Sequence, residues 1–87
     1  MERTLQISNR LGLHARAAAK FVQTATRFDA ELYVVKDGME VNGKSIMGIM
    51  MLAAGKGTQI RIRAEGADEE DAVRSLTSLV TTKFEEE

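Results

Sequence analysis

The stretch Gly12–Ala19, GLHARAAA, marks the place where an extended pattern of residues gives way to the first predicted helix. It contains His14, the only histidine of the chain, at the junction of loop and helix. The free N–H groups and positive dipole of a helix N-terminus disfavour an imidazolium ion, and they stabilise a phosphoryl dianion once the neutral ring has accepted one. His14 is therefore a candidate phosphoryl carrier, with Arg16 as a fixed positive charge nearby. The alternative is that His14 is an ordinary surface or capping residue.

The composition predicts one soluble globular domain over residues 1–87, with 44% hydrophobic and 29% charged residues. A net charge of −1 and only three phenylalanines and one tyrosine argue against a nucleic-acid partner, because both a basic patch and a stacking platform are missing. The absence of cysteine and the single histidine argue against disulfides and zinc, so we expect no metal and no cofactor. No apolar run approaches the ~18 residues of a membrane span, and the N-terminus has no signal-peptide core. We therefore expect a cytoplasmic protein without membrane insertion.

Periodic spacing divides the first half of the chain into a strand, a helix and a hairpin. Residues 4–8 alternate between polar and apolar, as a half-buried strand does. Residues 15–27 are expected to form a helix, because apolar side chains recur at helical spacing there and at the residue that follows, namely Ala18, Phe21, Val22, Ala25 and Phe28. Residues 30–36 alternate again, and the pair Asp37-Gly38 predicts a tight turn into a returning strand at residues 39–42.

The segment that follows predicts a short helix and another strand. Ser45 is a preferred N-cap for the apolar residues 46–52, and the glycines of Gly55-Lys56-Gly57 end that helix. Residues 58–64 alternate once more, which buries Ile60 and Ile62 and leaves Arg61 and Arg63 on a solvated face.

The last segment predicts a helix that Asp68 caps, with an acidic first turn. Its apolar stripe consists of Ala72, Val73, Leu76, Leu79 and Val80, and Phe84 is expected to extend it before the acidic residues 85–87 fray. The order is thus β-α-β-β-α-β-α. Strands with polar outer positions have one covered and one solvated face. We therefore expect an α+β fold, an open-faced β-sandwich in which a four-stranded, mostly antiparallel sheet carries three helices on one face.

Three segments carry a family resemblance: GLHAR at residues 12–16, NGKSIMG at 42–48 and AEGADEE at 64–70. Together they resemble the HPr family, the histidine-containing phosphocarriers of the bacterial phosphoenolpyruvate-dependent sugar phosphotransferase system. Length and element order also match, so the resemblance covers essentially the whole chain.

The resemblance implies a carrier with a covalent phosphohistidine, and not an enzyme that turns over substrate alone. Enzyme I, charged by phosphoenolpyruvate, would transfer a phosphoryl group to Nδ1 of His14, which would pass it to the A domain of a sugar permease. Arg16 matches the arginine that neutralises phosphate charge in the family. Family members usually carry proline where this chain has Ala17, so we expect a less constrained junction between loop and helix. We also expect a monomer.

Ser45 has a regulatory interpretation beside its structural one as an N-cap. The segment KSIMG at residues 44–48 resembles the segment that HPr kinase/phosphorylase phosphorylates in Gram-positive and some other bacteria. The resemblance then implies two further partners, this kinase and a transcriptional regulator. A phosphoserine would place about −1.5 to −2 charges beside an apolar patch, which should weaken the binding of carrier partners.

We expect a flexible apolar patch around His14 to contact several unlike partners. The residues assigned to partner contact are Leu13, Ala17, Ile46, Met47 and Met50. The competing interpretation makes the methionine-rich segment part of the core, since apolar residues at helical spacing usually pack inward. If Met47 and Met50 surround the His14 site, Ile49 and Leu52, on the opposite side of that helix, are expected in the core.

Two alternative functions stay open at this stage. Within the same family, a nitrogen-related paralogue uses equivalent chemistry for regulation, and residues 8–12 and 28–31 have some of its character. The other alternative is a regulatory module that acts through Ser45 without carrying phosphate, although such a relative would be expected to lack the active histidine. A generic RNA-binding or ligand-binding domain would need an aromatic sheet surface or a glycine-rich phosphate loop, and the sequence has neither.

Overall fold

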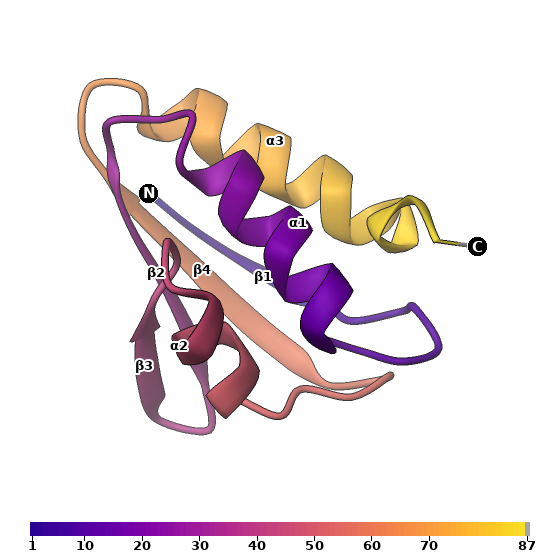
Figure 1. The fold of residues 1–87 in the computed structure, drawn as a ribbon. Coiled ribbons are helices and arrows are strands. Elements are labelled where there is room, and N and C mark those ends of the chain that lie inside the picture. Colours follow the sequence, from indigo (N-terminus) through magenta and orange to yellow (C-terminus); the bar gives the residue numbers. More distant parts are fainter. Residues whose placement is uncertain (87) are drawn as a thin grey trace.

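The computed structural model describes residues 1–86. The elements follow the predicted order, and Figure 1 shows them along the chain: β1 (Glu2–Gln6), α1 (Ala15–Ala25), β2 (Glu31–Lys36), β3 (Met39–Asn42), α2 (Ile46–Met51), β4 (Gln59–Glu65) and α3 (Glu69–Thr81). A single 3-10 turn, η1 (Lys83–Glu85), follows α3. No helix within residues 1–86 has the length and apolar character needed to cross a membrane.

The four strands form one sheet in the order β1-β4-β2-β3, and every neighbouring pair is antiparallel. Helices α1 and α3 lie side by side over this sheet, and α2 lies beside β3 at one end of it (Figure 1). The predicted α+β open-faced sandwich is therefore confirmed. The sheet is fully antiparallel, where the sequence predicted a mostly antiparallel one.

One core fills the space between the sheet and the helices. The inward positions of β2 and β4 are buried as the alternation predicts, among them Leu32, Val34, Ile60 and Ile62. The predicted stripes of α1 and α3 face them, with three differences: Val22, Phe28 and Leu79 are only partly buried. On the opposite sheet face, the Arg63 guanidinium lies 4.4 Å from the Tyr33 ring centre and 3.0 Å from a Glu40 carboxylate oxygen, as befits a solvated strand surface.

Two element boundaries differ from the prediction. The first strand covers Glu2–Gln6, two residues before the predicted 4–8. Its antiparallel partner β4 begins at Gln59, which lies opposite Gln6, so the paired part of β1 ends there. Pairing nevertheless continues past the strand, since Ile7 N–H donates to the Thr58 carbonyl at 2.8 Å. Helix α1 ends at Ala25 and not at residue 27, because the chain then turns toward β2. The other boundaries agree to within about one residue.

Asp68 stands at the start of α3, but its carboxylate makes no capping bond to the helix within the described residues. It accepts hydrogen bonds from the N–H groups of Asp29 and Ala30, both at 2.9 Å, and so ties α3 to the turn before β2. The Asp29 N–H, with help from that of Ala30, lowers the pKa of Asp68. The predicted side-chain cap was thus wrong because these two N–H groups compete for the same oxygens.

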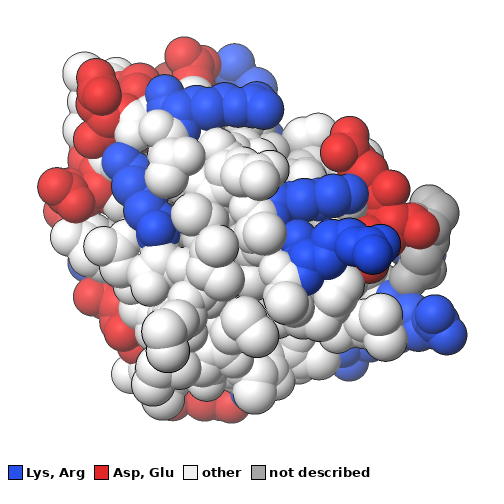
Figure 2. Space-filling model, in the orientation of Figure 1, with Lys and Arg blue, Asp and Glu red and all other residues white. Residues whose placement is uncertain are grey.

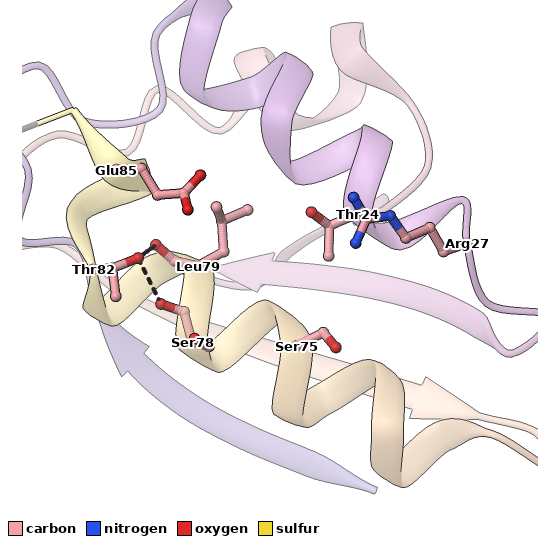
Figure 3. Close-up of a pocket in the computed structure, with 7 residues that line it drawn as sticks. All are labelled: Thr24, Arg27, Ser75, Ser78, Leu79, Thr82 and Glu85. Carbon is pink, nitrogen blue, oxygen red and sulfur yellow. Dashed lines mark hydrogen bonds between the residues drawn. The ribbon is translucent and has the colours of Figure 1, made fainter.

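The chain changes direction sharply after α3. The Thr82 hydroxyl donates to the carbonyls of Ser78 (2.8 Å) and Leu79 (3.1 Å), which closes the end of the helix (Figure 3). Lys83, Phe84 and Glu85 then adopt positive φ angles of 56°, 55° and 60°. Phe84 is buried as predicted, but it belongs to this turn and does not extend the apolar stripe of α3.

Candidate functional site

His14 immediately precedes α1, as the sequence predicted. Its carbonyl accepts the first helical hydrogen bond, from Ala18 N–H at 2.8 Å. The N–H groups of residues 15–17 therefore have no acceptor within the helix and form the positive end of its dipole. His14 occupies the N-cap position of α1, but within the described part of the chain its side chain makes no capping hydrogen bond to the helix.

The loop before His14 is fixed by a close backbone contact with the segment after α2. Leu13 N–H donates to the Ala54 carbonyl at 2.9 Å. Gly12 has φ +65°, and a Cβ built on it would clash with the Ala54 carbonyl oxygen and lie 2.7 Å from the Gly55 Cα. A glycine is therefore required here on two grounds, the left-handed conformation and the close approach.

The carboxylate of Glu86 lies against the ring of His14. Both of its oxygens are 2.9 Å from Nε2, and the side chains of His14 and Glu86 are 27% and 13% exposed. Asn9, which is fully buried, donates through Nδ2 to Glu86 Oε1 at 3.3 Å and to the Gly12 carbonyl at 2.8 Å. The prediction that the acidic tail frays is wrong at Glu86, and Glu87 lies outside the described residues.

Sequence reasoning missed Asn9 and Glu86 as members of the site. Glu86 is 72 positions from His14, so no local spacing links them. The available signal was Phe84. A large apolar residue beyond a helix end is usually buried, and its burial keeps the neighbouring residues, Glu86 included, close to the protein surface. Asn9 gave no signal by type, since asparagine is common in turns.

Arg16 is exposed on the first turn of α1. Among residues 1–86 it forms no ion pair and no hydrogen bond through its side chain. Its guanidinium is thus available at the same helix end as His14. Arg16 is the second residue of α1 and follows His14 by two positions, and no direct bond joins the two side chains within residues 1–86.

An uncharged surface covers α2 and the adjoining end of α1, and lysine and arginine side chains border it on both sides (Figure 2). Its large exposed apolar side chains are Ile46, Met47, Met50 and Met51, of which Met47 is the most exposed at 75%. Leu11, in the loop before His14, is exposed as well. We call the four α2 residues Ile46, Met47, Met50 and Met51 the apolar patch. Ile49 and Leu52 are buried, so the predicted division of α2 into an outer and an inner side is confirmed.

Leu13 and Ala17 do not belong to this patch. Leu13 is 5% exposed and Ala17 is fully buried, so this conformation presents neither side chain at the surface, and their contact with partners stays a prediction. The side chain of Leu13 belongs to the hydrophobic core, while its N–H donates to the Ala54 carbonyl. Ala17 lies one helical turn before the buried Phe21 and shares its inward face.

Ser45 is the N-cap of α2. Its hydroxyl oxygen accepts a hydrogen bond from Gly48 N–H at 3.0 Å, which confirms the structural interpretation. The side chain is half-buried, and the next two residues belong to the apolar patch. Within residues 1–86, no cluster of three or more histidine, cysteine, aspartate or glutamate side chains is placed to hold a metal ion.

Comparison with known proteins agrees with this site. The family model described as "PTS HPr component phosphorylation site" matches residues 1–82. The phosphocarrier protein HPr of Neisseria meningitidis serogroup A is 54% identical over 86 residues, which cover 99% of this chain and 97% of that protein. A crystal structure of HPr from Thermoanaerobacter tengcongensis matches with a TM-score of 0.97 and 50% identity, over 100% of this chain and 98% of the other.

A crystal structure described as an HPr dimer from the same organism matches less closely, with a TM-score of 0.79 and 50% identity over 97% of each chain. Some relatives therefore form dimers, and the monomer expected for this chain stays a prediction. The loop held by the Ala54 carbonyl, the histidine ahead of α1 and these relationships over nearly the full length agree with one another. The chain belongs to the HPr family, the phosphocarrier components of the phosphotransferase system.

Proposed function

We propose that this protein carries a phosphoryl group on Nδ1 of His14, taken from phosphorylated enzyme I and given to the A domain of a sugar permease in the bacterial cytoplasm. The observation that carries the proposal is the position of a half-exposed His14 directly ahead of the first N–H groups of α1, which have no acceptor within that helix. Membership of the HPr family supports the choice of donor and acceptor.

The chemistry needs little rearrangement of the site. The lone pair of Nδ1 forms a bond to phosphorus while the bond between phosphorus and the donor atom breaks, and the electron pair leaves with the donor. The N–H groups at the start of α1 and the guanidinium of Arg16 lie at the same helix end and would stabilise the new dianion. Donation to the permease domain is the same step in reverse, so the protein is restored and is not consumed.

The first test is incubation with enzyme I and phosphoenolpyruvate, followed by intact mass and by ³¹P NMR. We expect one acid-labile phosphoryl group on the wild type, at Nδ1 of His14, and none on His14→Ala. Gln23→Ala, an exposed change on the same helix, is the matched control and should be phosphorylated like the wild type. A folded wild type that accepts no phosphate, while a known carrier does in the same mixture, would refute the proposal.

The apolar patch is the proposed docking surface for both partners. Met47 is its most exposed member, and Met39 is an exposed methionine on the hairpin strand β3 outside the patch. We expect Met47→Gln to slow transfer several-fold through weaker partner binding, and Met39→Gln to leave it unchanged. Equal effects of the two substitutions would contradict docking through the patch.

The acceptor distinguishes the sugar branch of the family from the nitrogen-related branch. The motif KSIMG at residues 44–48 supports the sugar branch. The deciding assay offers the phosphorylated protein to the A domain of a sugar permease and to the nitrogen-related A domain in parallel. Faster transfer to the nitrogen-related domain would move this chain to the regulatory branch.

A second candidate function is regulation through phosphorylation of Ser45 by an HPr kinase/phosphorylase, with binding of a transcriptional regulator as its consequence. The observation that favours it is the half-buried hydroxyl at the start of α2, directly before Ile46 and Met47 of the apolar patch. A phosphoryl group there would add about −1.5 to −2 charges to an apolar docking surface. Ser45→Asp should therefore slow phosphorylation of His14 by enzyme I, while Ser45→Ala should not. An unchanged rate for Ser45→Asp would contradict this regulation.

A further inference from the structure

The contact between Glu86 and His14 determines which ring nitrogen carries the proton. Both carboxylate oxygens lie 2.9 Å from Nε2. An ionised carboxylate can only accept hydrogen bonds, so Nε2 must be the donor. In the neutral ring the lone pair is then on Nδ1, the nitrogen bonded to Cγ and therefore nearer the backbone.

Glu86 is itself held in place by the buried side chain of Asn9. Asn9 uses its amide nitrogen for two bonds, to the Gly12 carbonyl at 2.8 Å and to Glu86 Oε1 at 3.3 Å. One buried group thus connects the loop that carries His14 with the carboxylate that contacts it. Because Asn9 is fully buried, its side chain cannot move aside without disturbing the core.

The backbone that delivers Glu86 is held against its own conformational preference. Three successive residues without glycine, Lys83, Phe84 and Glu85, have positive φ angles, which side-chain-bearing residues adopt only when other contacts compensate. The fully buried ring of Phe84 supplies one such contact. The Lys20 ammonium supplies another, since it donates to the Phe84 carbonyl at 2.7 Å.

We propose that Glu86 is a positioning residue for phosphoryl transfer, which holds His14 in the Nε2–H tautomer and so presents the lone pair of Nδ1 to phosphorus. When the Nδ1–P bond forms and the donor bond breaks, the ring keeps its Nε2 proton and gains positive charge. The negative charge of Glu86 stabilises that charge, and the same contact restores a neutral Nε2–H ring when the phosphoryl group leaves. This inference rests on the proposed carrier function.

The first test reads the tautomer directly and does not depend on any transfer. Nitrogen-15 shifts of the imidazole ring, recorded by NMR on the free protein at a mildly alkaline pH where a histidine ring is neutral, distinguish Nε2–H from Nδ1–H. We expect a single Nε2–H tautomer in the wild type and in Glu86→Gln, whose amide oxygen still accepts. Glu86→Ala should give a mixture of tautomers. A wild type with the same mixture as Glu86→Ala would overturn the proposal.

The matched control is Glu85, the neighbouring carboxylate, which lines the groove between α1 and α3 and not the histidine site (Figure 3). Glu85→Ala removes the same side chain one residue earlier and should leave the ring spectrum unchanged. A urea titration of each variant establishes that it is folded before its spectrum is compared. A tautomer shift in Glu85→Ala as large as in Glu86→Ala would mean that only the fold of the turn matters, and would overturn the role of Glu86.

The second test measures the rate of phosphoryl transfer from phosphorylated enzyme I by rapid quench. We expect Glu86→Ala to slow transfer about tenfold, as loss of a group that orients a catalytic histidine does at the low end. Glu86→Gln, which keeps the tautomer and loses the charge, should fall between it and the wild type, and Glu85→Ala should match the wild type. Wild-type rates for Glu86→Ala would refute the positioning role. By contrast, a wild type that takes no phosphate on His14 would refute the carrier function itself, while the NMR result would still stand.

Discussion

Replacement of Gly12 by alanine tests how the loop before His14 is built. The new Cβ would meet two backbone groups, the Ala54 carbonyl oxygen and the Gly55 Cα at 2.7 Å, neither of which can rotate away. The left-handed conformation alone costs about 1–2 kcal/mol for a residue with a side chain. Displacement of the Ala54 backbone would also weaken its bond to Leu13 N–H, which is worth about 1 kcal/mol. We therefore expect Gly12→Ala to lower the free energy of unfolding by about 2–4 kcal/mol.

Gly38 provides a control that separates the two contributions. It has φ +82°, and a Cβ there would find nothing within 4 Å, so Gly38→Ala should cost only the conformational part of about 1–2 kcal/mol. Urea unfolding followed by circular dichroism measures both variants under the same conditions. If Gly12→Ala is no more destabilised than Gly38→Ala, then the close approach to Ala54 does not constrain this loop, and our account of how His14 is placed is wrong.

Three further predictions follow from contacts at the helix ends. Asp68→Asn should be less stable than the wild type near neutral pH, and the difference should shrink in acid. Hydrogen bonds lower the pKa of Asp68 in the folded state, so its contribution to stability is complete above the usual pKa of 3.8 and disappears as the pH falls through the lowered pKa. Urea midpoints over a pH series check this, and a difference independent of pH would contradict it. Ser45→Ala should lose about 1 kcal/mol of stability with its bond to Gly48, whereas Ser45→Thr should retain most of it. Phe84→Ala should cost about 3–5 kcal/mol as a buried aromatic truncation, and hydrogen exchange in the 83–86 segment should rise; an unchanged midpoint would show that the segment is not anchored by this ring.

The fold could be predicted from the sequence because its signals are local and agree with one another. Alternation in β2 and β4 identified Leu32, Val34, Ile60 and Ile62 as core, and all are buried. The Asp37-Gly38 pair identified the hairpin, where both residues have positive φ. The errors at β1 and at the end of α1 have a tertiary cause, since partner strands and packing decide where an element stops.

The site could be predicted only as far as local signals reach. His14, Arg16 and Ser45 stand out because each occupies a helix start, which a sequence pattern shows. Glu86 could not be found in this way, because its contact with the ring depends on a turn whose left-handed residues no propensity favours. Leu13 likewise contacts a group distant in sequence, the Ala54 carbonyl, which no local pattern shows.

The order of the strands has a consequence for the time course of folding. Strand β1 pairs only with β4 within the described sheet, so Glu2 cannot pair until Arg63 has been synthesised and brought beside it. The β2–β3 hairpin, by contrast, needs only the residues of its own turn and strands. Closing so long a loop is the slow part of folding, because the chain loses conformational entropy before the stabilising contacts between the two strands form. During synthesis the hairpin can therefore form early, but the histidine loop needs Ala54 and then Glu86 to be complete. His14 is therefore synthesised well before the groups that surround it, and its surroundings are complete only after Glu86 has been added.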